Sequence, residues 1–274
     1  MGGRGGVGKL NSSGILRGLG YKKGKEGFAD KLAEAKEGMW WTPRERLEYS
    51  INPEHAKGMT IQDHELYKTN CALCTTALAL NQMGYDVEAL PRDVTQWRGS
   101  TTIFNIDYSD YTSFVTGGDV ANYTSLHVDG DHFFDAYLNP NVIASSSSLA
   151  QAKDIVNVMK SWGPNSFADI SLAWKSGGAH SEFLFCDKSG NVHLFDGQTG
   201  DIFHGAEAIA KELSHAKLKE TLITRLDNVS FKPNIAKELK KMVKKSTWRT
   251  KWANWDKEDK GNFELYDEFI VKKS

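Results

Sequence analysis

The chain has 274 residues, 40% of them hydrophobic, which is enough for one substantial core but too little for two large enzymes. The formal net charge is -1, so no overall field favours binding to nucleic acid or to an anionic membrane surface. There are 3 cysteines, an odd set that does not resemble the disulfide framework of a secreted scaffold, and we expect reduced thiols.

The amino-terminal residues 1–45 predict a flexible, basic, glycine-rich arm followed by a short amphipathic helix over residues 28–38. Its glycines match parts of a dinucleotide fingerprint and of a phosphate loop. No predicted strand precedes them, however, and Leu10 stands where a phosphate loop needs a hydroxyl, so we expect no nucleotide site. Because no secretion signal or membrane span is recognisable, we expect synthesis in the cytoplasm.

The first part of the main domain, residues 46–230, is predicted to contain a helix followed by a strand. Apolar residues recur at helical spacing over residues 71–83, and Gly84 ends this pattern before a strand over residues 85–90. Residues 99–150 are rich in Thr, Ser, Tyr, Asp and Gly and are interpreted as an insertion of short strands and loops.

The second part of this domain is predicted to contain a helix followed by three strands. The helix covers residues 150–162 and is ended by Gly163 and Pro164. The strands cover residues 167–174, 179–186 and 191–195, and the last two form a hairpin.

Residues 231–274 are predicted to form an amphipathic helical extension. Its apolar side chains, including a series of tryptophans at helical spacing, are expected to pack on the core. A helix that binds a partner or a membrane surface is the alternative. The members of this pattern are Ile235, Leu239, Met242, Trp248, Trp252 and Trp255.

Cys71 stands at the expected start of the first helix, where the helix dipole favours a thiolate. Asn70, directly before it, is expected to cap that helix. Cys74, one turn further in, is interpreted as a small buried residue. These positions make Cys71 the candidate nucleophile.

A cysteine nucleophile needs a base and a group that orients the base, and the hairpin offers both. His180 lies near the start of its first strand and Asp196 follows its second strand, so antiparallel pairing brings the two to one end of the sheet. Cys71, His180 and Asp196 are therefore predicted as the catalytic group, with no metal and no cofactor. Gly177 and Gly178 leave room beside them.

A series of short motifs extends over roughly residues 50–205 in a fixed order. They are Asn52-Pro53, Tyr67, Asn70-Cys71-Ala72-Leu73-Cys74, Gly84-Tyr85-Asp86-Val87-Glu88-Ala89, Trp162-Gly163, Gly178-Ala179-His180 and Phe195-Asp196-Gly197-Gln198-Thr199-Gly200. In this order they resemble the papain-fold toxins, a bacterial and phage-associated family that includes proposed glutamine deamidases. The resemblance implies an α+β, papain-like fold in which an amino-terminal helix with the catalytic cysteine packs on an antiparallel sheet carrying the histidine and the aspartate.

The resemblance also implies residue roles. Cys71 matches the nucleophile, His180 the general base and acid, and Asp196 the residue that orients the histidine. Asn70, Gln198 and Gly178 are candidates for substrate binding or the oxyanion hole. Two departures are visible: Gly197 replaces a frequent proline, and Gln62 lies too far before Cys71 to match the usual oxyanion glutamine.

The function implied is deamidation of protein glutamine, by a toxin or effector. A protease or a transglutaminase of the same fold is the alternative. Expected partners are a protein substrate and either an immunity protein or a phage structural protein, with no nucleic acid. Delivery into a target cell or carriage in a phage particle stays open.

Other classes of function depend on the same cysteines. Cys71 and Cys74 have the spacing of a dithiol redox pair, but the residues before them are too polar for the buried strand that such a fold needs. A zinc site from Cys71, Cys74, Cys186 and a histidine lacks a second closely spaced ligand pair. A binding protein with a degenerate enzyme fold is the remaining alternative.

Overall fold

A computed structural model describes residues 32–33, 51–52, 66–93, 95, 98–105, 113–116, 141–143, 147–232 and 235–245. The fold is mixed α+β, as the sequence predicts. Its centre is a seven-stranded sheet with the order β4-β3-β9-β5-β6-β7-β8, in which every pair is antiparallel except β3 with β4. The strands are β3 (Ser113–Thr116), β4 (Asn141–Ile143), β5 (Phe167–Trp174), β6 (Ala179–Cys186), β7 (Val192–Phe195), β8 (Ile202–His204) and β9 (Ala216–Arg225).

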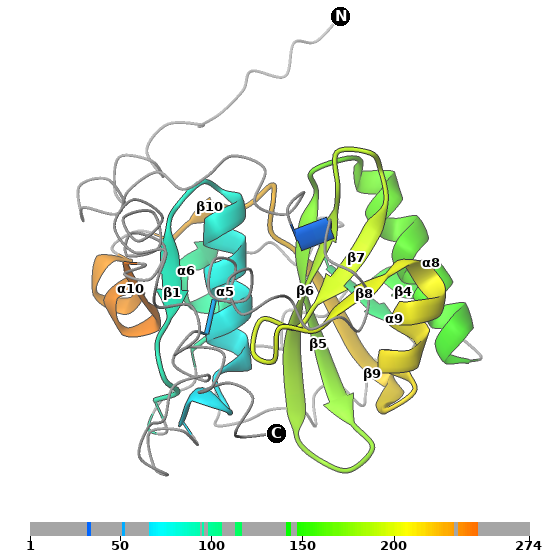
Figure 1. Ribbon diagram of the computed structural model, residues 1–274, viewed down its shortest axis with the longest axis horizontal. Helices are drawn as coiled ribbons and strands as arrows, with labels where there is room; N and C mark the ends of the chain where they lie inside the picture. The colour runs from blue at the N-terminus through cyan, green and yellow to red at the C-terminus, as the bar shows by residue number, and fades with distance from the viewer. Residues whose placement is uncertain are drawn as a thin grey trace, which may run out of the picture.

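Helices cover both faces of this sheet (Figure 1). Helix α5 (Cys71–Gln82) lies on one face, and α8 (Ser148–Trp162) and α9 (Gly205–Leu213) lie on the other. The alternation of side chains along β6 explains the two layers. Phe183 and Phe185 join the core under α5, whereas Leu184 and Cys186 join the core under α8 and α9.

The layer that contains α5 is completed by segments from both ends of the described chain. Strand β1 (Val87–Ala89) follows α5 and pairs with β11 (Val243–Lys245). Helix α6 (Ser100–Ile103) leads into β2 (Phe104–Asn105), which pairs with β10 (Ser230–Phe231). Helix α10 (Ala236–Met242) packs in the same layer, since Leu239 and Met242 are fully buried in its core.

Most of the expected elements are present. The predicted helices near residues 71–83 and 150–162 correspond to α5 and α8, and the three predicted strands after residue 166 correspond to β5, β6 and β7. The insertion expected to hold only short strands and loops begins with a helix, because residues 100–103 form α6 before the two-residue strand β2. The carboxy-terminal helix is also shorter than expected, because residues 243–245 are a strand.

The amino-terminal arm and the tryptophan series lie outside the described residues. Of the helix expected over residues 28–38, the described residues 32–33 are helical. Within the described part of the chain, the helices are too short or too polar to cross a membrane.

Candidate functional site

Helix α5 holds Cys71 at its first position because almost all of the helix is buried between β1 and the main sheet. Cys71 itself is 9% exposed. The first-turn amides of an α-helix have no partner within the helix, so the backbone amide of Cys71 lies beside its own thiol as a potential donor. The predicted placement of this cysteine at a helix start is confirmed.

The predicted capping role of Asn70 is wrong, because its side chain makes no capping hydrogen bond to α5. Its amide nitrogen instead donates to Asn52 Oδ1 at 3.1 Å and to the Leu90 carbonyl at 2.9 Å. Its Oδ1 accepts from Cys74 Sγ at 3.4 Å and from Gln198 Nε2 at 3.4 Å. Asn70 therefore ties the start of α5 to the segments around it, and both of its amide hydrogens are in use.

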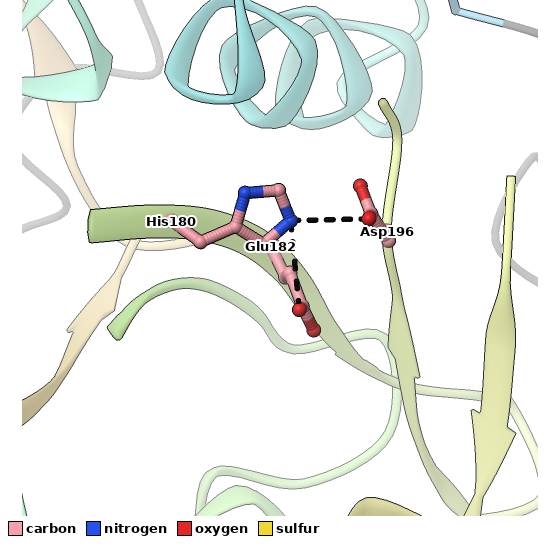
Figure 2. A group of neighbouring side chains, drawn as sticks. All are labelled: His180, Glu182 and Asp196. Carbon is pink, nitrogen blue, oxygen red and sulfur yellow. Dashed lines mark hydrogen bonds and ion pairs between the residues drawn. The ribbon is translucent and has the colours of Figure 1, made fainter. Parts of the chain in front are cut away.

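The hairpin of β6 and β7 brings His180 and Asp196 together, as the sequence predicts. Phe183 of β6 pairs with Phe195, the last residue of β7. Asp196 therefore comes directly after β7, and His180 lies on the part of β6 that extends past the end of β7. His180 Nε2 is 3.0 Å from Asp196 Oδ2 (Figure 2).

The Cys71 thiol lies near enough to His180 to raise the pKa of its imidazole. Because Nε2 is occupied by Asp196, the ring offers Nδ1 to the thiol, and Figure 2 shows this nitrogen on the side of the ring toward α5. Burial alone would lower the pKa of His180, but the hydrogen bonds and negative charges of Asp196 and Cys71 outweigh burial and raise it from 6.5 to about 11. At neutral pH the imidazole is therefore protonated.

Asp196 is held in place by its own loop. Its Oδ1 accepts from the backbone amides of Gln198 at 2.7 Å and Thr199 at 3.3 Å, and its Oδ2 accepts from Thr199 Oγ1 at 3.0 Å. Burial would raise the pKa of Asp196, but the hydrogen bond and charge of His180, with the loop donors, keep it below 3.8. Asp196 is therefore an anion that can orient His180 and stabilise its positive charge.

Trp174 is a site residue that the sequence did not reveal. Its ring stacks on His180 with the centroids 5.5 Å apart and the planes 29° apart. Trp174 is the last residue of β5 and lies across the turn from His180. An aromatic residue at the end of a hairpin strand, opposite a candidate histidine, was the feature of the sequence that could have indicated this contact. The stacked ring limits access of water to the histidine.

Glu182 is the second residue that sequence reasoning missed. It is 0% exposed and lies two residues after His180, so both side chains project from the same face of β6. Its Oε1 is 3.7 Å from His180 Nε2 (Figure 2). A lone acid inside the apolar stretch of β6 was the signal in the sequence.

The ligand atoms of His180, Glu182 and Asp196 lie within 4.8 Å of one another and form a candidate set for a divalent cation. A cation there would have to replace the proton between His180 Nε2 and Asp196 Oδ2, which are at hydrogen-bond distance. The cluster can therefore act as a metal site or as an acid–base pair, but not as both at once. The hydrogen bond between His180 Nε2 and Asp196 Oδ2 is already formed, so we assign the cluster to the acid–base pair and not to a metal site.

The other expected substrate contacts lie near the triad. Gln198 Nε2 is 3.4 Å from Asn70 Oδ1, which places this amide beside the start of α5. Gly178 has a φ of 84° in the turn between β5 and β6, a conformation that favours glycine, and its carbonyl accepts from the Trp174 amide. Gly178 thus shapes the turn that leads into His180, and its role toward a substrate stays a prediction.

The remaining cysteines have separate surroundings. Cys74 is fully buried in the core under α5, where burial and the charges of Asp196 and Cys71 raise its pKa well above 9.0. Cys186 is buried in the core on the opposite face of the sheet. A zinc site that uses all three cysteines is therefore not assembled.

Comparison of the chain with models of known protein families, with curated proteins and with solved structures found no match.

Proposed function

We propose that this protein is a papain-like cysteine amidohydrolase that deamidates glutamine side chains of other proteins. The observation that carries the proposal is that His180 Nε2 is 3.0 Å from Asp196 Oδ2 while the Cys71 thiol, at the start of α5, lies near enough to raise the pKa of the same imidazole. A thiol, an imidazole and an orienting carboxylate in this order are the parts that nucleophilic cysteine catalysis needs.

In the first half of the reaction, the Cys71 thiolate attacks the carboxamide carbon of the substrate. The backbone amide of Cys71, with the Gln198 side chain as a second donor, stabilises the oxyanion. His180 then gives its proton to the departing nitrogen, and ammonia leaves as the thioester forms.

In the second half, a water molecule gives its proton to the neutral His180 and attacks the thioester. The Cys71 thiolate leaves, the imidazolium forms again beside Asp196, and the product is a glutamate side chain.

The same residues would cleave a peptide bond if the substrate offered its main chain, or join a lysine if an amine replaced water. Protease and transglutaminase activity therefore stay as alternatives, together with an immunity protein or a phage structural protein as partner. A dithiol redox role receives less support, because Cys74 is fully buried and its thiol is hydrogen-bonded to Asn70.

The proposal is tested by intact-mass analysis of candidate protein substrates after incubation with the purified protein. We expect a gain of about 1 Da for each glutamine deamidated, and no gain with Cys71→Ala. Fragments would indicate a protease instead. Cys186→Ala is the matched control, since it removes a buried thiol on the opposite side of the sheet and should keep the activity. A mass gain that persists in Cys71→Ala would overturn the proposal, and loss of activity in Cys74→Ser would favour a redox pair.

A further inference from the structure

Glu182 is a buried ionisable group in the site that the proposed mechanism does not use. Among the described residues, neither of its carboxyl oxygens has a hydrogen-bond partner, although the side chain is 0% exposed. A buried carboxylate without donors is strongly unfavourable, whereas a buried carboxylic acid costs much less. The surroundings of Glu182 therefore favour its protonated form.

The register of the hairpin places a second carboxyl group directly beside it. Phe183 of β6 pairs with Phe195 of β7 in antiparallel register. Glu182, one residue before Phe183, therefore lies opposite Asp196, one residue after Phe195. Two carboxylates this close in a buried site cannot both be ionised at low cost. Asp196 receives hydrogen bonds from His180 and from its loop, whereas Glu182 receives none from the part of the chain that the structure describes. The negative charge therefore lies on Asp196 and the proton on Glu182.

The charges around Glu182 agree with this assignment. His180 faces it from β6, Asp196 from the end of β7, Glu212 from α9 and Cys71 from α5. Only His180 among these can be a cation, and Asp196 already pairs with it. Burial, and then the charge of Asp196, raise the pKa of Glu182 well above 4.5.

We propose that Glu182 is a positioning residue that carries a proton at neutral pH, so that His180 faces a single carboxylate and can release its own proton to the leaving group. This role rests on the proposed function. If Glu182 were ionised, a second anion at 3.7 Å would hold the proton on His180 more tightly. The step in which His180 gives its proton to the departing nitrogen would then slow. Ionisation of Glu182 at high pH therefore sets an upper pH limit for the reaction.

The protonation of Glu182 is tested without any substrate by urea unfolding of the full chain and of Glu182→Gln. The unfolded chain releases the Glu182 proton above its ordinary pKa of 4.5, whereas the folded chain keeps it. The wild type should therefore lose stability relative to the variant as the pH rises from about 5 to about 8. A difference in urea midpoint that stays constant, or that changes in the opposite direction, would overturn the proposal.

The effect on catalysis is tested by ammonia release from a short glutamine-containing peptide. Because glutamine is a neutral isostere, Glu182→Gln should keep the rate near pH 7 within about threefold and should shift the alkaline decline of kcat to higher pH. A loss of more than about tenfold near pH 7, or an unchanged alkaline decline, would contradict the role.

Two controls keep the outcomes separate. Glu182→Met is also neutral and of similar length, so it replaces the glutamine variant in both experiments if that variant does not fold. If the wild type releases no ammonia, the proposed function fails and the role of Glu182 in proton release fails with it. The urea series still decides whether the Glu182 proton is present.

Discussion

Among single residues, the charge on Asp196 is what allows His180 to stay protonated beside the thiol. Asp196→Asn keeps the shape of the side chain but removes this charge, so the pKa of His180 should fall and Cys71 should lose the cation beside it. We expect alkylation of Cys71 by iodoacetamide to slow by about tenfold or more, and the proposed deamidation by about a hundredfold.

The same hairpin offers a matched control in Asp187. This aspartate accepts from His193 Nε2 at 3.1 Å and from the backbone amides of Ser189 and Asn191 at 2.8 Å, so it resembles Asp196 in its contacts. Asp187→Asn should lower stability in a similar way but leave the alkylation rate unchanged. Equal slowing in both variants would mean that the effect of Asp196 is structural.

The sequence predicted that Cys71, His180 and Asp196 act together because their types and order carry the signal, and the structure places His180 and Asp196 3.0 Å apart. It did not predict the state of Glu182, since that depends on the register that sets Asp196 opposite it, and residue spacing along one strand does not specify a register. Trp174 was missed for a similar reason, because its contact with His180 crosses the hairpin turn.

Among the elements, α5 depends on Asn70 to fix the position of its first turn. Asn70→Ala would leave the Leu90 carbonyl and Asn52 without their donor, and we expect a loss of about 3 kcal/mol in the free energy of unfolding. Because the start of the helix would also shift, alkylation of Cys71 should slow. Urea unfolding and the alkylation rate measure the two effects.

A substitution of Asn81, near the other end of α5, separates the loss of stability from the effect on alkylation. Its amide donates to the carbonyls of Ala77 at 2.7 Å and Val87 at 2.9 Å, and it is equally buried. Asn81→Ala should destabilise the fold to a comparable extent without slowing alkylation. If it slows alkylation as much as Asn70→Ala does, the start of α5 has no special role.

Apart from α6, the elements that the sequence did not predict lie after β7. Strand β9 lies within the main sheet between β3 and β5, yet it includes the buried polar residues Thr221 and Thr224. Alternating or continuous apolar residues are the usual signal for a strand, and β9 lacks a clear version of either. Its position depends on long-range pairing, which local sequence does not display.

For the whole molecule, the main question is whether the segment after β10 is an appendage or a part of the core. The sequence predicted a helical extension that packs on the core, and α10 does so around α5; the pairing of β11 with β1 was not predicted. The boundary near residue 230 therefore separates segments that share one core, as the burial of Leu239 and Val243 indicates.

Leu239→Ala tests this continuity, because a cavity in a shared core weakens the whole domain. Leu239 is 0% exposed in the same cluster as Leu78 and Phe183, so its truncation should lower the free energy of unfolding by about 2–5 kcal/mol. Tryptophan fluorescence and far-UV circular dichroism in urea should report one coincident transition at a lower midpoint. Leu149→Ala makes the same chemical change on α8 at a site that is 39% exposed, and it should change the free energy of unfolding by less than about 0.5 kcal/mol. An appended helix would give the opposite pattern for Leu239, with the main transition unchanged and an early one for the extension alone.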